Sequence, residues 1–192
     1  MTIRDQILDA ALKVLRERGP ARATTKEIAR VAGCSEGSLY NHFENKESLF
    51  VAVIMERLPP FVALLKSLLE RAGEGSVRDH LEEVARTAVA FYIEAMPLAA
   101  AALAAPDMRE SLRRQNAGPH RGNEMLAIYL RLEQRLGRIH RNISPDAAAA
   151  LLLGACQQRA LQLPFLAEDA VIVPADRFAA DLVAALMQGI TP

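Results

Sequence analysis

The chain has 192 residues, a length typical of one compact domain or of two small ones that share a core. Lys plus Arg and Asp plus Glu each number 23, so the formal net charge is zero, which argues against a polybasic membrane binder and against a non-specific coat for nucleic acid. Apolar residue types make up 51% of the chain, enough for a real core. Alanine alone accounts for 34 residues, against 26 for Val, Ile and Thr together, a balance that favours helices over sheets.

Four helices are predicted in the first sixty residues. Each begins at a Thr, Ser or Asn whose side chain can cap a helix N-terminus, and glycine or proline residues separate most of them. The predicted helices cover residues 2–18, 24–32, 35–41 and 46–58. The Pro59-Pro60 pair is expected to kink or interrupt the fourth, because the two rings remove backbone donors.

The rest of the chain also follows a helical period. Apolar residues between Leu81 and Ala95 predict a helix that starts at Ser76. Further helices are predicted over Pro97–Ala105, over residues 120–138, from Ser144 to about Leu163, and from Pro174 onward through Phe178–Met187. The segment Val171–Val173 resembles a strand, but three residues do not make a sheet. The sequence therefore predicts an all-α fold.

Cysteine usage and the chain start bear on the compartment. Cys34 and Cys156 form no Cys-x-x-Cys motif, so neither a disulfide scaffold nor a zinc site is predicted. The first residues lack the hydrophobic segment of a signal peptide. The longest apolar run, Ala95 to Ala105, is interrupted by Pro97 and is too short to span a bilayer. We expect a cytoplasmic protein without a membrane segment and without a metal or other cofactor.

The second and third predicted helices have specific packing demands. Gly33 lies in the tight turn between them and tolerates a positive φ angle. Ala29 is small where the next helix must cross closely, and Ile28, Val31 and Leu39 can form a small core between the two helices. This is the helix-turn-helix arrangement, in which the second helix is presented to a DNA major groove.

Residues 24–49 read TTKEIARVAGCSEGSLYNHFENKESL and resemble the TetR family of bacterial transcription regulators. The resemblance lies in the Thr pair, the Ile-Ala, the Ala-Gly turn, the Ser-x-Gly, the Leu-Tyr-x-His-Phe and the Lys-Glu-x-Leu, all in fixed order. It implies a helix-turn-helix DNA-binding domain over residues 1–46, with the motif at about 24–43. A helical effector-binding and dimerisation domain over residues 47–192 would follow.

Ten residues of the N-terminal segment are predicted to face DNA. Thr24 and Thr25 lie at a helix N-terminus, where free amides, hydroxyls and the helix dipole suit a phosphate. Ser35, Gly37 and Ser38 are small and allow close approach of the backbone to the groove. Tyr40 and His42 point their polar tips outward, and Lys46 can meet a phosphate. Glu36 and Asn41 can read cytosine and adenine edges, respectively. Packing of Tyr40 on the first helix, and a merely solvated His42, remain alternatives.

Positive charge is scarce in this segment. Residues 1–50 contain eight Lys or Arg against seven acids, and no arginine lies in the predicted recognition helix. Affinity for DNA should then depend on a few placed phosphate contacts that a symmetric dimer doubles, with a modest dependence on salt.

Formal matches to catalytic motifs in the sequence do not predict an enzyme. Gly33-Cys34-Ser35-Glu36-Gly37 formally matches the Gly-x-Ser-x-Gly nucleophile elbow, but that motif follows a strand, and here a helix precedes it. None of the four histidines stands in a His-Glu-x-x-His motif. We expect no catalytic activity.

Residues 147–155 are apolar around the whole circumference of their helix, which requires burial on two sides. Together with the last helix, Phe178 to Met187, they predict a four-helix dimer interface with two helices from each subunit. A fully internal helix is the alternative.

The middle helices carry residues that could line an apolar pocket. The predicted ligand-binding set is Phe61, Leu65, Phe91, Met96, Met108 and Tyr129, with Leu69 and Leu103 as further lining and Arg86, Tyr92, Glu94 or Gln157 as polar anchors. For any one of them, ordinary core packing remains the alternative.

The family resemblance implies a repressor that an apolar or amphipathic small molecule releases from its DNA operator by shifting the population of conformers. The alternative is a DNA-binding protein whose second domain only dimerises or binds a protein partner.

Overall fold

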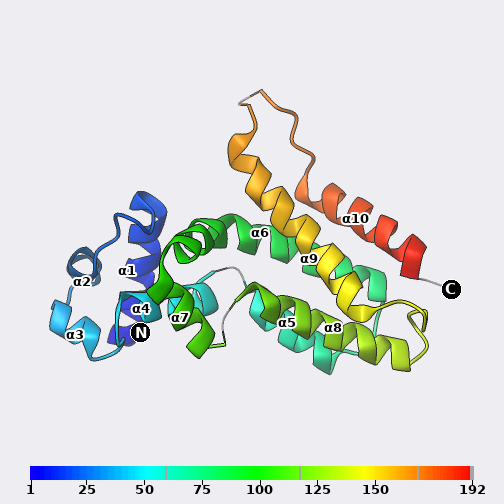
Figure 1. Cartoon of the computed structure of the whole chain (residues 1–192), viewed down its shortest axis with the longest axis horizontal. Helices are drawn as coiled ribbons and strands as arrows, with labels where there is room; N and C mark the ends of the chain where they lie inside the picture. The colour runs from blue at the N-terminus through cyan, green and yellow to red at the C-terminus, as the bar shows by residue number, and fades with distance from the viewer. Residues whose placement is uncertain (59, 117, 168, 191–192) are drawn as a thin grey trace. The chain divides into compact units, whose positions relative to one another are not determined.

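The structure, a computed structural model, describes residues 1–58, 60–116, 118–167 and 169–190. Its regular elements are helices, which confirms the all-α prediction (Figure 1). They are α1 (Ile3–Arg18), α2 (Thr25–Ala32), α3 (Glu36–Tyr40), α4 (Lys46–Glu56), α5 (Phe61–Glu70), α6 (Val77–Ala104), α7 (Pro106–Arg114), α8 (Pro119–Arg135), α9 (Pro145–Gln162), a short 3-10 turn (Leu163–Phe165) and α10 (Ala175–Ile190).

The helix starts follow the predicted caps. The Thr, Ser or Asn side chain before each of six helices accepts a hydrogen bond from the backbone amide three residues later, and so satisfies one of the donors that a helix N-terminus leaves free. The capping residues are Thr2, Thr24, Ser35, Asn45, Ser76 and Ser144.

Two local predictions were incomplete or wrong. Pro97 does not separate two helices, because α6 runs through it from Val77 to Ala104. The proline removes only one backbone donor and leaves the carbonyl of Ile93 without its helical partner. Burial of Leu98 and Ala102 on the far side of the proline outweighs that loss. The sequence predicted no separate helix for α5 or α7, and their N-cap residues, Pro60 and Ala105, make no side-chain cap.

The chain forms two compact units. Unit 1 comprises residues 1–58 and 94–118, and unit 2 comprises residues 59–93 and 119–192. The compact unit at the N-terminus is thus larger than the predicted segment 1–46, since it takes in α4, α7 and the last part of α6. The division within α6 falls between Ile93 and Glu94, close to Pro97.

The core of unit 1 fixes the helix-turn-helix. Ile28 and Leu39 are fully buried, and Phe43 is nearly so. They belong to one cluster with residues of α1 and α4 and with three from the second segment of the unit, while Val31 packs at the edge. The three are Leu98, Ala102 and Met108. The predicted packing roles of Ile28, Val31 and Leu39 are therefore confirmed.

Unit 2 combines an apolar core with a small buried polar network. Glu133 is fully buried, accepts a hydrogen bond from the backbone amide of Gly73 at 3.1 Å, and lies 3.2 Å from the Arg138 guanidinium. The ion pair with Arg138 compensates part of the cost of burying this charge, although Oε2 of Glu133 makes no hydrogen bond within the described residues. The thiol of Cys156 is free and buried, and burial raises its pKa to about 12. Cys34 is also free.

By length and composition, α6 is a helix of the described chain that could cross a membrane. The prediction of no membrane segment considered only the apolar run Ala95 to Ala105, with its interruption at Pro97. It did not consider the whole of α6, which continues through Pro97. Buried residues of α6 account for part of its apolar character, namely Leu81, Val84, Ala85, Ala88, Val89, Tyr92, Ala95, Leu98 and Ala102.

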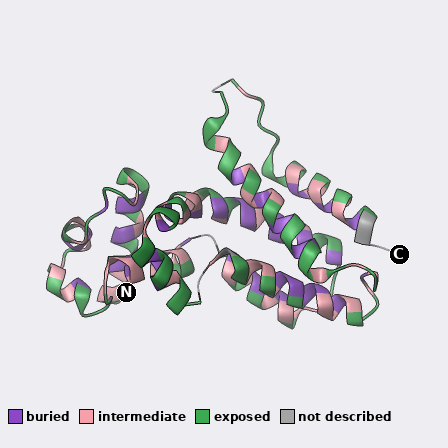
Figure 2. Cartoon of the chain, viewed as in Figure 1, coloured by how far each residue is buried: buried purple, intermediate pink, exposed green. Residues whose placement is uncertain are grey.

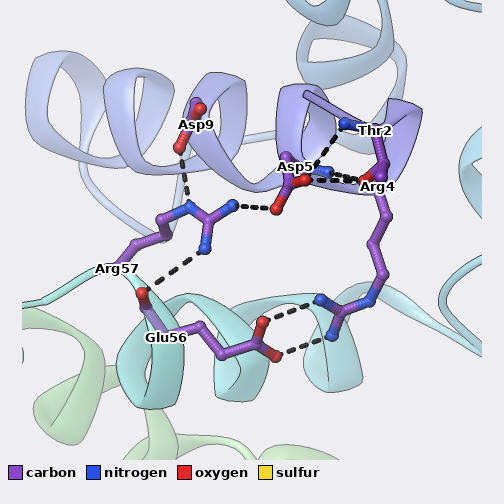
Figure 3. Close-up of polar contacts among 6 residues, drawn as sticks. All are labelled: Thr2, Arg4, Asp5, Asp9, Glu56 and Arg57. Atoms are coloured by element: carbon purple, nitrogen blue, oxygen red, sulfur yellow. Dashed lines mark hydrogen bonds and ion pairs between the residues drawn. The ribbon is translucent and has the colours of Figure 1, made fainter.

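Two arginines join α1 to the end of α4 (Figure 3). Arg57 donates to Asp5 at 2.6 Å and to Asp9 at 2.7 Å. Arg4 makes two hydrogen bonds to Glu56, at 2.6 and 2.7 Å, the bidentate geometry that is strongest for Arg and carboxylate. Hydrogen bonds from Thr2 and then from Arg57 hold the pKa of Asp5 well below its usual range.

These contacts predict a pH-dependent stability. A carboxylate with a lowered pKa stabilises the fold above its unfolded-state pKa of about 4, and the stabilisation is lost as the pH falls through the folded-state pKa. Asp5→Asn keeps an oxygen acceptor but not the charge. We expect it to lower the melting temperature at pH 7, and the difference from wild type to shrink below about pH 4. Circular dichroism melts from pH 7 to pH 2 measure this, with the exposed Asp107→Asn as control. A difference that stays constant with pH would contradict the prediction.

Candidate nucleic-acid interface

The turn between α2 and α3 depends on one backbone conformation. Gly33 has φ 71° and ψ 27°, the left-handed region, and its amide points back to the carbonyls of Ala29 and Arg30. The amide of Cys34 also donates to the carbonyl of Ala29 at 3.0 Å. A Cβ atom at Gly33 would meet nothing within 4 Å, so glycine is required here for its φ angle and not for space.

The helix α3 has a buried and an exposed side. Leu39 is fully buried, whereas the side chains of Ser35 and Asn41 and the backbone at Gly37 are exposed. Ser35 is the N-cap, and its hydroxyl accepts a hydrogen bond from the amide of Ser38 at 3.0 Å. A Cβ atom at Gly37 would make only an ordinary contact, 3.8 Å from the hydroxyl of Ser35. The start of α3 is therefore open to solvent.

Three predicted contact residues come together across the turn. The hydroxyl of Thr25 in α2 donates to the carboxylate of Glu36, the first residue of α3. The hydroxyl of Tyr40 donates in turn to the Thr25 oxygen at 3.3 Å. Tyr40 stays 47% exposed, while Thr25 and Glu36 are half-buried. The structure thus links three of the ten predicted residues in one hydrogen-bonded chain, which we call the Tyr40–Thr25–Glu36 chain.

The remaining predicted contact residues differ in exposure and in the interactions that they already make. Thr24 is exposed and caps α2, and His42 is exposed just after α3. Lys46 is half-buried, donates to the carbonyl of Pro20 at 3.4 Å, and lies 5.2 Å from the centre of the Phe50 ring. Its ammonium group is therefore already held within unit 1.

The sequence interpretation passed over two exposed cations beside the threonine pair. Arg22 and Lys26 are both exposed and lie within two residues of Thr24. Their position next to a helix N-terminus that suits a phosphate was the signal that could have identified them.

The predicted ligand-binding set is split between the two units. Met96 and Met108 belong to unit 1, where Met108 is part of the buried core. Phe61, Leu65 and Tyr129 are buried in unit 2. The two methionines thus belong to a different packing unit from the other predicted lining residues.

The aromatic residues of unit 2 pack on one another. The ring centre of Phe61 lies 5.2 Å from that of Phe91 and 5.9 Å from that of Tyr92. Burial raises the pKa of Tyr92 to about 12. Tyr129 is engaged elsewhere, since its hydroxyl lies 2.8 Å from Nδ1 of His80. Phe61, Phe91 and Tyr92 therefore form one aromatic cluster.

Two of the proposed polar anchors already have charged partners. Glu94 accepts hydrogen bonds from Arg16 within unit 1. Arg86 lies 3.5 Å from Asp176 and 3.9 Å from Glu82 within unit 2. Tyr92 remains as a buried hydroxyl, and Gln157 as a half-buried amide.

Comparison with known proteins identifies the N-terminal segment. Residues 7–53 match the family model of the bacterial regulatory proteins of the tetR family. The fatty acid metabolism regulator protein of Bacillus subtilis is 35% identical over 57 residues, which are 30% of this chain and 29% of that protein. The match to this curated relative therefore spans less than a third of either chain.

Solved structures extend the likeness in fold to the whole chain. A TetR-family transcriptional regulator from Mesorhizobium loti superposes with a TM-score of 0.76 at 22% identity, over 98% of this chain and 96% of that one. The transcriptional regulator FadR from Bacillus subtilis, in complex with stearoyl-CoA, superposes with a TM-score of 0.72 at 17% identity, over 96% and 98% of the two chains. Residues 7–53 thus match the model of the tetR family of bacterial regulatory proteins, and the fold of the chain is shared along its length with solved TetR-family regulators.

Proposed function

We propose that this protein is a sequence-specific DNA-binding transcription regulator of the cytoplasm, a repressor that a small apolar or amphipathic ligand releases from its operator. The observation that carries the DNA-binding part is the two-sided environment of α3. Leu39 holds the helix on the core of unit 1, while the backbone at Gly37 and the side chains of Tyr40 and Asn41 are exposed. A helix anchored in this way can enter a major groove with its N-terminal residues first.

Binding to two half-sites requires a dimer, and α9 supplies a surface for it. Its inward side is buried through Ala149, Leu152 and Cys156, whereas its outward side is exposed (Figure 2). Apart from Asp146 at the N-terminal end, the exposed residues of α9 carry no charge; they are Ala147, Ala150, Leu151, Gly154, Gln158, Leu161 and Gln162. Leu151 is 64% exposed. An apolar stripe of this kind is typical of an interface with a second copy, and Phe178, Leu182 and Leu186 of α10 are half-buried candidates beside it.

The aromatic cluster of Phe61, Phe91 and Tyr92 is the candidate place for an effector in unit 2. A structural neighbour that contains stearoyl-CoA supports an amphipathic ligand. The alternative is a unit 2 that only dimerises or binds a protein. Stearoyl-CoA and single-chain fatty acids are suitable first probes, since release of bound DNA by one of them would distinguish the two.

The primary test is selection of genomic DNA fragments by the purified full-length protein. We expect wild type to enrich one common sequence with two related halves, and Tyr40→Ala to lose most of that enrichment. Met55→Ala, at a 45% exposed position of α4, controls for loss of an exposed apolar side chain in the same unit. Equal enrichment by wild type and Tyr40→Ala would contradict the assignment of α3 as the recognition helix.

Gly37→Ala separates the stability of α3 from its function. The added methyl group has room in the free protein, and alanine is the better helix former, so the free energy of unfolding should rise by up to about 1 kcal/mol. If the backbone at this position approaches the DNA closely, affinity for the selected sequence should fall about tenfold or more. Urea denaturation and fluorescence anisotropy measure the two effects. Unchanged DNA affinity would argue against a close approach at Gly37.

The dimer interface is tested at its most exposed leucine. We expect Leu151→Arg to shift the protein from dimer to monomer in sedimentation velocity, because the charge would be buried without a partner. Leu103→Arg, at a 75% exposed position of α6 in unit 1, should leave the dimer intact. A Leu151→Arg protein that remains a dimer would place the interface elsewhere.

A further inference from the structure

We propose that Glu36 is a specificity-determining residue of this interface: in the free protein its carboxylate occupies the place of a DNA phosphate, and it gives up that place only where a base edge can donate a hydrogen bond to it. The proposal rests on the DNA-binding function proposed above. It follows from the Tyr40–Thr25–Glu36 chain, which joins three residues of the open face of the helix-turn-helix.

The direction of the hydrogen bonds shows that the hydroxyls of Tyr40 and Thr25 are already committed as donors. Each hydroxyl has one proton. Tyr40 donates its proton to the Thr25 oxygen, and Thr25 donates its own to the carboxylate of Glu36. A phosphate oxygen only accepts hydrogen bonds, so neither hydroxyl can serve a phosphate while this chain is intact. Contact between Thr25 and the DNA backbone therefore requires Glu36 to leave.

The same place cannot hold two anions. Thr25 is the first residue of α2, so the carboxylate of Glu36 lies at the positive end of that helix, as a phosphate would. The sequence of α3 is EGSLY, in which Glu36 is the one charged residue. No cation on α3 therefore neutralises the carboxylate once a phosphate approaches. The displaced carboxylate needs a new hydrogen-bond donor.

In the major groove only two bases offer such a donor, cytosine at N4 and adenine at N6, whereas guanine N7 and O6 and thymine O4 are acceptors. Glu36 is the first residue of the recognition helix, the end that reaches base edges in helix-turn-helix proteins. Over cytosine or adenine the carboxylate exchanges one donor for another. Over an edge that only accepts hydrogen bonds, the carboxylate is repelled and has no donor, so the affinity for that DNA sequence falls.

The test compares Glu36→Gln with wild type on two duplexes, the sequence recovered by genomic selection and a scrambled sequence. The glutamine side chain carries no charge to repel a phosphate and can both donate and accept. We expect affinity for the scrambled duplex to rise about five- to tenfold, the order expected when one unpaired like charge is removed at close range. The ratio of specific to scrambled affinity should fall by a similar factor. Glu44→Gln, an exposed acid after α3, removes the same charge and should change both affinities equally.

A second arm replaces each base pair of the recovered half-site in turn. At one cytosine or adenine position, wild type should lose about tenfold in affinity while Glu36→Gln loses little. Thr25→Val, which removes the hydroxyl that links the chain, should weaken binding to both duplexes. The proposal is overturned if Glu36→Gln keeps the wild-type ratio of affinities, or if Glu44→Gln reproduces its effect. Failure of wild type and all variants to bind any duplex would instead overturn the DNA-binding function, and this proposal with it.

Discussion

The burial of Leu39 in one core with Ile28 and residues of α1 is the interaction on which the rest of this molecule depends. A helix of five residues such as α3 is unstable by itself, because nucleation fixes several backbone angles for a single hydrogen bond. It persists here because Leu39 and Ile28 are fully buried in the core of unit 1. The left-handed Gly33 allows the chain to reverse within the few residues between α2 and α3. The exposed edge of α3 is therefore a product of packing on its other side.

Charge pairing explains why the interface is only weakly basic. The cations of unit 1 are largely occupied by carboxylates of the same unit: Arg57 with Asp5 and Asp9, Arg4 with Glu56, Arg16 with Glu94, and Arg18 with Glu27. Exposed ion pairs add little to stability individually, but they remove these arginines from any general attraction to DNA. On the proposed function, recognition then depends on placed groups such as Thr25 and Tyr40. In such an interface the proposed role of a single carboxylate at the start of α3 is to limit which sequences are accepted.

Unit 2 has a different physical character. Its interior contains an ion-paired charge at Glu133 and an aromatic cluster around Phe61, while the outward stripe of α9 is mostly apolar and exposed. Gly122 on α8 permits this arrangement, because an added Cβ atom would lie 3.3 Å from the Phe61 ring. The inner groups hold the helices of the unit together. The outer stripe leaves apolar area that a partner of the same composition can cover.

The sequence alone determined what depends on residues a few positions apart. Capping side chains, the 3.6-residue period and the Gly33 turn act within one or two helical turns, so the all-α class, the first four helices and the helix-turn-helix were predicted correctly. Tertiary structure decided what depends on which faces meet. In the structure α6 continues through Pro97, and Met96 and Met108 belong to a different unit from the aromatic cluster. The Thr25 hydroxyl donates to Glu36 across the turn. These outcomes depend on packing energies summed over distant residues, for which a one-dimensional pattern has no signal.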